Sequence, residues 1–147
     1  MLKLKKTISL LALLLLHIQS NSQVFPNSPQ YKTVQKFFSN NPQNLAKLVS
    51  SINIDTYGKC LANVTQWDIG IMSKQIDPDS ETKLSLAVQW VGLVAARNKL
   101  MSQGISDSQL NASLKSYESR MEFGKGGSNF KNWSLECNNI ALDAINN

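Results

Sequence analysis

The sequence predicts an all-α protein with a single domain of five to six helices and one disulfide. Three observations lead to this fold class. Apolar residues recur at helical spacing, with no strand-like alternation longer than a few residues and no repeated unit. Ser, Asn, Asp, Pro and Gly stand where these segments should start and stop. The 147 residues, 42% of them apolar, suit one modest core.

The N-terminus is expected to be a secretory signal peptide, residues 1–22. Three lysines precede an apolar run over Ile8–Leu16, and serines at both the −3 and −1 positions favour cleavage after Ser22. Cleavage after Ser20 and an uncleaved N-terminal anchor are the alternatives, although the run is short for a membrane span. Export would place the protein in the periplasm or outside the cell, with no membrane span in the mature chain.

Removal of this segment changes the charge arithmetic. The chain has 15 Lys+Arg and 10 Asp+Glu, a formal charge of +5. Residues 1–22 contain three of the lysines and no carboxylate, so the mature charge is 12 minus 10, or +2. The remaining cations are scattered, so no nucleic-acid partner is expected. The only histidine, His17, also leaves, which removes Ser–His and Cys–His nucleophile pairs and imidazole ligands. We therefore expect no enzyme, no catalytic residue, no metal and no cofactor.

The helical domain is expected to span residues 29–147, after a flexible lead over residues 23–28. Its first half contains three predicted helices. A first helix is expected from Ser28-Pro29, with an N-cap and Pro at the first helical position, to just before Asn41-Pro42, where a second begins in the same way. A third helix is expected from near Asp55 to about Lys74. The apolar residues of the second and third helices fall on one face of each: Leu45, Leu48, Val49 and Ile52, then Cys60, Val64, Trp67 and Ile71.

The second half contains three further predicted helices. The fourth begins at Asp77-Pro78 and ends at Gly104, and apolar residues cover nearly its whole circumference, which predicts a central, buried helix. The fifth begins at a capping box, Ser106 to Gln109, and ends at Gly124. A flexible connection over residues 124–128 leads into the sixth, whose apolar face includes Cys137.

The two cysteines are expected to form a disulfide, Cys60–Cys137. Each lies on the apolar face of a predicted helix, and the exported chain would fold in an oxidising compartment. A redox pair is the alternative, but such pairs usually use a close Cys-x-x-Cys motif, which is absent. The sequence therefore favours a structural staple between the third and sixth helices.

Two groups of residues are candidates for catalysis or for phosphate binding. Glu118 and Glu122 are one helical turn apart, as paired carboxylates of a glycosidase could be, but a solvated helix face explains them better. The glycines and lysine of residues 124–128 do not follow the order of a phosphate-binding loop. A flexible basic loop can instead contact a partner, so the predicted partner-binding residues are Lys125, Gly126, Gly127 and Ser128.

An exported helical domain with one cysteine near each end resembles the small all-helical periplasmic immunity proteins that neutralise type VI secretion effectors, of the amidase-immunity group. The matching residues are Cys60 within Tyr57-Gly58-Lys59-Cys60-Leu61 and Cys137 within Leu135-Glu136-Cys137. The resemblance is architectural and covers about residues 55–145. It implies a non-catalytic inhibitor that plugs the active site of a secreted toxin or envelope enzyme with a surface loop, often from a homodimer. The loop at Gly124–Ser128 or the one at Gln75–Asp79 would make the contact.

Three other functions remain open from the sequence. A periplasmic chaperone or envelope-stress protein would bind many clients weakly. A helical carrier of an apolar ligand would line its cavity with Trp90 and the leucines of the fourth helix. A hydrolase without histidine would use Glu118 or Asp68, and is the least favoured.

Overall fold

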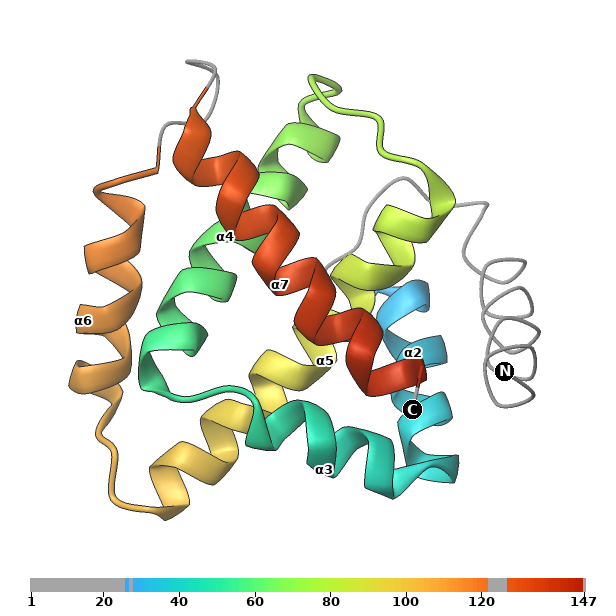
Figure 1. Ribbon diagram of the computed structural model, residues 1–147, viewed down its shortest axis with the longest axis vertical. Coiled ribbons are helices and arrows are strands. Elements are labelled where there is room, and N and C mark those ends of the chain that lie inside the picture. The colour runs from blue at the N-terminus through green and yellow to red at the C-terminus, as the bar shows by residue number, and fades with distance from the viewer. Residues whose placement is uncertain (1–25, 27, 122–126, 147) are drawn as a thin grey trace.

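The protein is a bundle of helices in a computed structural model that describes residues 26, 28–121 and 127–146 (Figure 1). These residues form six helices and no strand, which confirms the all-α fold class. The predicted signal peptide, most of the lead, and Lys125 and Gly126 lie outside the described residues. The helices are α2 Pro29–Asn40, α3 Pro42–Ser50, α4 Ile54–Met72, α5 Ser80–Ser102, α6 Asp107–Glu118 and α7 Ser128–Asn146.

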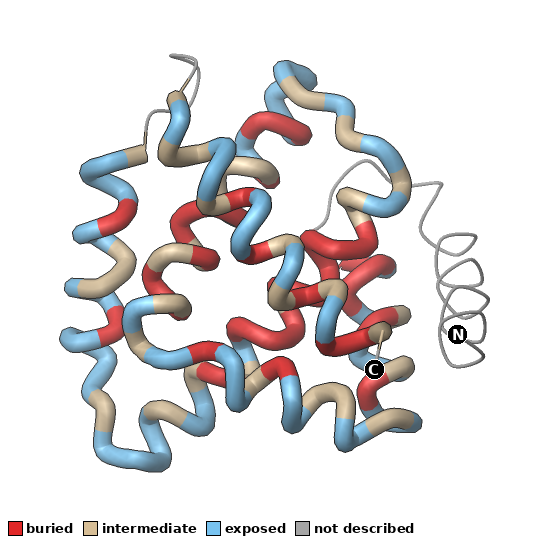
Figure 2. Tube along the Cα trace, in the orientation of Figure 1, coloured by how far each residue is buried: buried red, intermediate tan, exposed pale blue. Residues whose placement is uncertain are grey.

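Helix α5 is the centre of the bundle, as its apolar circumference predicts. It contacts α2, α3, α4 and α7, and Leu84, Leu86 and Leu93 on it are almost completely buried. Figure 2 shows the buried residues gathered on α5 and on the sides of the neighbouring helices that face it. Helix α6 lies at one edge and packs chiefly on α4 (Figure 1). Within the described part of the chain, no helix combines the length and apolar content needed to cross a membrane.

The caps predicted at Ser28 and Ser106 are observed, whereas Asn41 precedes α3 without a side-chain cap hydrogen bond and its Nδ2 donates instead to Phe37 O at 2.8 Å. Ser28 Oγ accepts a hydrogen bond from the backbone N–H of Tyr31 at 3.1 Å, and Ser106 and Gln109 form both bonds of the capping box. Helix α5 differs, because it begins at Ser80 rather than at Asp77-Pro78. The physical reason is that Asp79, not Asp77, has the extended backbone of an N-cap and accepts from Thr82 N–H at 2.8 Å.

The N-cap of α5 gives a pH-dependent prediction. Hydrogen bonds from the backbone and side chain of Thr82 hold the pKa of Asp79 below its usual 3.8. A lowered folded pKa means that the cap stabilises the fold above about pH 3.8 and that this contribution is lost as pH falls through the lower folded value. Asp79→Ala is expected to cost about 1 kcal/mol in urea unfolding at pH 7. Asp79→Asn keeps the acceptor and should cost less. A cost for Asp79→Ala that persisted unchanged at pH 2 would contradict the assignment.

The end of α4 carries a residue in a left-handed conformation. Lys74 has φ +60°, while Gln75 N–H and Ile76 N–H both donate to Gly70 O. A residue with a Cβ pays roughly 1 kcal/mol in this conformation, and glycine avoids that cost. Part of the gain is offset because glycine makes the unfolded chain more flexible and so loses more conformational entropy on folding. Lys74→Gly is expected to raise the free energy of unfolding by about 0.5 kcal/mol. The matched control is Gly104→Ala, at φ +94° beyond the end of α5, which should destabilise by a similar or larger amount. Thermal unfolding of both variants tests the pair, and a Lys74→Gly variant less stable than the parent would contradict it.

Candidate protein-binding surface

The disulfide joins α4 to α7, as predicted, and underlies one face of the molecule. Cys60 and Cys137 are both buried, and their Cα atoms are 5.7 Å apart. The residues that precede them in sequence, Lys59 and Glu136, form an ion pair at 3.0 Å. Covalent and ionic links therefore hold α4 and α7 together at the same level of the bundle.

Helix α6 approaches α4 very closely on the other side of the ion pair. Gly58 has no side chain, and a Cβ placed on it would stand 2.1 Å from Ser113 Oγ and 2.6 Å from the Ser113 carbonyl carbon. The Ser113 hydroxyl donates to the backbone O of Ile54 at 2.8 Å. The glycine thus lets the two backbones meet and brings the end of α6 alongside α7.

Three side chains from α6, the turn after it and α7 form an aromatic–cation cluster: Tyr117, Arg120 and Trp133. The Tyr117 and Trp133 rings meet edge to face, with centroids 5.0 Å apart. The Arg120 guanidinium carbon lies 4.5 Å from the centre of the Tyr117 ring and 5.6 Å from that of Trp133. Tyr117 is buried, Trp133 is half-buried and Arg120 is exposed, so the cluster rises from the core to the surface.

Polar contacts fix the base of this cluster. The Tyr117 hydroxyl donates to Asp55 Oδ1 at 2.5 Å. Burial, and then the hydrogen bond to Asp55, raise the pKa of Tyr117, against opposing effects of Lys59 and Arg120. Burial alone would lower the pKa of Lys59, but the hydrogen bond and charge of Glu136 outweigh it and the pKa is raised. At neutral pH the ring of Tyr117 is therefore uncharged and Lys59 is cationic.

The cluster adjoins the connection predicted to bind a partner. Helix α6 ends at Glu118 rather than at Gly124, and the turn after it places Arg120 beside α7. Asn129 Nδ2 donates to Arg120 O at 2.9 Å, so the two sides of the connection are tied together. Of the predicted residues, Gly127 and Ser128 lie at the start of α7, while Lys125 and Gly126 lie outside the described residues. The other predicted loop, Gln75–Asp79, joins α4 to α5.

Sequence reasoning missed the aromatic–cation cluster. The apolar face predicted for the sixth helix contains Trp133, and the solvated face predicted around Glu118 contains Arg120, so neither pattern alone indicates a shared surface site. The helical spacing of Tyr117 and Arg120 was the available signal, but it does not show that α7 brings an indole to the same place.

The other residues considered as candidates for chemistry in the sequence do not form a shared site among the described residues. Trp67 Nε1 donates to Ser134 Oγ at 2.9 Å, and Trp90 Nε1 donates to the buried Asp68 carboxylate at 2.7 Å. Glu118 is exposed on α6, and Glu122 lies outside the described residues. Across the described ranges, no three His, Cys, Asp or Glu side chains converge closely enough to hold a metal ion.

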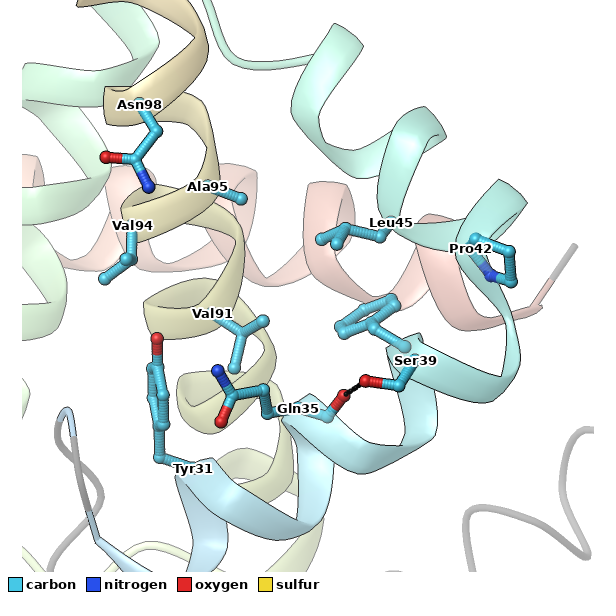
Figure 3. A pocket seen from close by; sticks show the side chains of 10 residues that line it. Tyr31, Gln35, Ser39, Pro42, Leu45, Val91, Val94, Ala95 and Asn98 are labelled. Carbon is cyan, nitrogen blue, oxygen red and sulfur yellow. Dashed lines mark hydrogen bonds between the residues drawn. The ribbon is translucent and has the colours of Figure 1, made fainter.

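A separate groove lies on the far side of α5, between α2, α3 and α5 (Figure 3). Its volume is about 380 Å³. Trp90 and the leucines of α5, expected to line a carrier cavity, do not line this groove. The residues that do are Tyr31, Gln35, Phe38, Ser39, Pro42, Leu45, Val91, Val94, Ala95 and Asn98.

The comparisons with known proteins leave the surface to be interpreted from its own chemistry. The chain matches no protein-family model, and no curated protein or solved structure is significantly similar to it.

Proposed function

We propose that the protein is an exported, non-catalytic inhibitor of the immunity type, which binds another protein through the aromatic–cation cluster. The observation that carries the proposal is the exposed Arg120 guanidinium lying over Tyr117 and Trp133. Arg, Tyr and Trp are the residue types that dominate binding energy at protein interfaces. Here all three lie together on a surface stiffened by a disulfide.

The hydrogen bonding of Arg120 supports a role beyond folding. Its Nε donates to Ser116 O at 3.0 Å and its Nη2 to Ser116 Oγ at 3.3 Å. No carboxylate among the described residues forms an ion pair with it. A guanidinium has five N–H donors, so several are left for an acceptor on a partner, while the aromatic rings fix its position. Preorganisation of this kind lowers the cost of binding.

The proposal has three further parts. Export rests on the predicted signal peptide and agrees with a disulfide, which persists in oxidising compartments. Inhibition would follow if the predicted contact residues Lys125, Gly126, Gly127 and Ser128, which lead into α7, entered the active site of a toxin or envelope enzyme. A homodimer would present two copies of the cluster.

The test is affinity capture from the envelope of the producing cell, followed by a binding assay with the captured protein. Arg120→Ala and Trp133→Ala are each expected to weaken binding by about 30-fold, as for a hot-spot residue worth about 2 kcal/mol. The control is Lys36→Ala, an exposed cation on α2 at the opposite end of the molecule, which should bind like the parent. The captured protein should be an enzyme or toxin whose activity falls on binding.

Two outcomes would overturn the proposal. One is the absence of any stable partner. The other is a partner whose affinity is unchanged by Arg120→Ala while the variant unfolds at the same temperature as the parent. Suppression of the aggregation of many unrelated proteins, with the same variants inactive, would indicate a chaperone instead.

A further inference from the structure

The groove between α2, α3 and α5 has an apolar floor. Phe38, Val91 and Tyr31 form the floor and are 1%, 5% and 7% exposed. Val94 at its edge is 37% exposed, and Met101, two helical turns further along α5, is 41% exposed. These are two of the few large apolar residues that the described surface leaves open to water. Arg97 and Asn98 lie between Val94 and Met101 on this helix, so the groove ends at Asn98 and Met101 is a separate exposed apolar residue.

Three of the four polar side chains that line the groove lie on one side of it. Figure 3 shows Tyr31, Gln35 and Asn98 on that side, and Ser39 on the other side with Leu45 and Pro42. Burial raises the pKa of Tyr31, so its hydroxyl remains a neutral hydrogen-bond donor at physiological pH. A pocket of 300–1,000 Å³ with mostly apolar walls and a few polar groups is typical of small-ligand sites. The groove thus has a place for a chain and a place for a head group.

The segments that line the groove carry charge of a single sign. Residues 28–53, which include α2 and α3, contain three lysines and no Asp or Glu, and residues 91–106 of α5 and the turn after it contain Arg97 and Lys99 and no Asp or Glu. Lys47 donates to Asp143 O at 3.2 Å, and Arg97 pairs with Asp107. The exposed lysines on these segments that form no ion pair among the described residues are Lys32, Lys36 and Lys99.

From this arrangement we infer that the α2–α3–α5 groove binds one long-chain carboxylate of the fatty-acid class. The alkyl chain lies over Phe38, Leu45 and Val91, and the carboxylate lies at the polar side of the groove near Lys32 and Lys36. Lys32 and Lys36 each directly follow a groove residue, Tyr31 and Gln35, on α2. The site is separate from the aromatic–cation cluster and goes beyond the proposed inhibitor function.

Other occupants fit the same observations less well. A second copy of the chain docked symmetrically through the groove would bring together two surfaces that both carry Lys32 and Lys36, and like charges facing each other are unfavourable. A protein interface of standard size involves about 20–30 residues on each partner, whereas ten residues from three helices line this groove. The volume and the single sign of charge point to one anionic chain.

The probe is laurate below its micelle concentration, with dodecylamine and dodecanol as head-group controls, added to the exported protein and followed by titration calorimetry and amide chemical shifts. Laurate is expected to saturate at one molecule per chain, with the largest shifts on α2 and the second half of α5. Val94→Glu places a carboxylate at the groove edge and should weaken laurate binding at least about tenfold. The matched control, Ile69→Glu on α4, changes a 50%-exposed residue outside the groove and should bind like the parent.

The charge of the head group is tested with Lys32→Glu/Lys36→Glu. The double variant should bind laurate at least about tenfold more weakly and dodecylamine more tightly than the parent does. Three results would each overturn the inference: equal affinity for laurate and dodecylamine, equal effects of Val94→Glu and Ile69→Glu, or binding of anionic vesicles without binding of free laurate. Arg120→Ala should leave laurate binding unchanged, so failure of this inference and failure of the proposed inhibitor function can be told apart.

Discussion

Replacing both cysteines, as Cys60→Ala/Cys137→Ala, is expected to lower the free energy of unfolding by about 4 kcal/mol, the largest effect of any change considered. The bond joins residues 77 apart in sequence, so its loss frees a long loop in the unfolded chain. Both cysteines are buried, so the double variant also loses some packing between α4 and α7. Urea unfolding measures the change, and the slope of the transition should rise because the unfolded chain becomes less compact.

The matched comparison for this prediction is the parent protein unfolded under reducing conditions. It should show a loss close to that of the double variant, because both lack the cross-link. A loss under about 1 kcal/mol in both would mean that the remaining α4–α7 contacts, such as Lys59–Glu136, hold the fold without the bond.

Gly58→Ala is expected to destabilise the protein by about 2–3 kcal/mol, although alanine is the better helix former by about 1 kcal/mol. The added methyl would stand 2.6 and 2.7 Å from the backbone C and O of Ser113, which cannot move without displacing α6. Removing the Ser113 side chain relieves the 2.1 Å contact with Oγ but not the contacts with the backbone, so Gly58→Ala should keep most of its cost in a Ser113→Gly background. Thermal unfolding of the four proteins in this cycle gives the coupling energy.

Gly92 provides the control, because its neighbour is a side chain. The three atoms nearest to a Cβ there all belong to the Leu48 side chain, with Cδ2 at 2.5 Å and Cγ at 2.8 Å. Gly92→Ala should cost about 1–2 kcal/mol in the parent and almost nothing in a Leu48→Ala background. Full rescue of Gly58→Ala by Ser113→Gly would contradict the backbone contact between α4 and α6.

The parts of the fold that depend on local sequence were predictable. The caps at Ser28 and Ser106 are hydrogen bonds between residues three apart, so their residue types alone predict them. The Cys60–Cys137 bond followed from two cysteines on apolar helix faces. The central position of α5 followed from apolar residues around its whole circumference.

The two proposed binding surfaces were not predictable in the same way. The early end of α6 accompanies the stacking of Arg120 on Trp133 and the bond from Asn129, contacts between helices that no local pattern describes. The α2–α3–α5 groove needs Val94 and Tyr31 to lie side by side, and that depends on how α2 crosses α5. Helix periodicity predicts which face is apolar, but not where two such faces leave a gap.

Helix α6 buries only Leu110 and Tyr117 and packs chiefly on α4. Few buried apolar side chains therefore attach α6 to the bundle. Segments of this kind can unfold locally at a free energy well below that of global unfolding. Amide hydrogen exchange should be faster in α6 than in α5. Since Tyr117 and Arg120 belong to this end of the molecule, a partner seated on them would slow that exchange, and part of its binding energy would be spent on ordering α6.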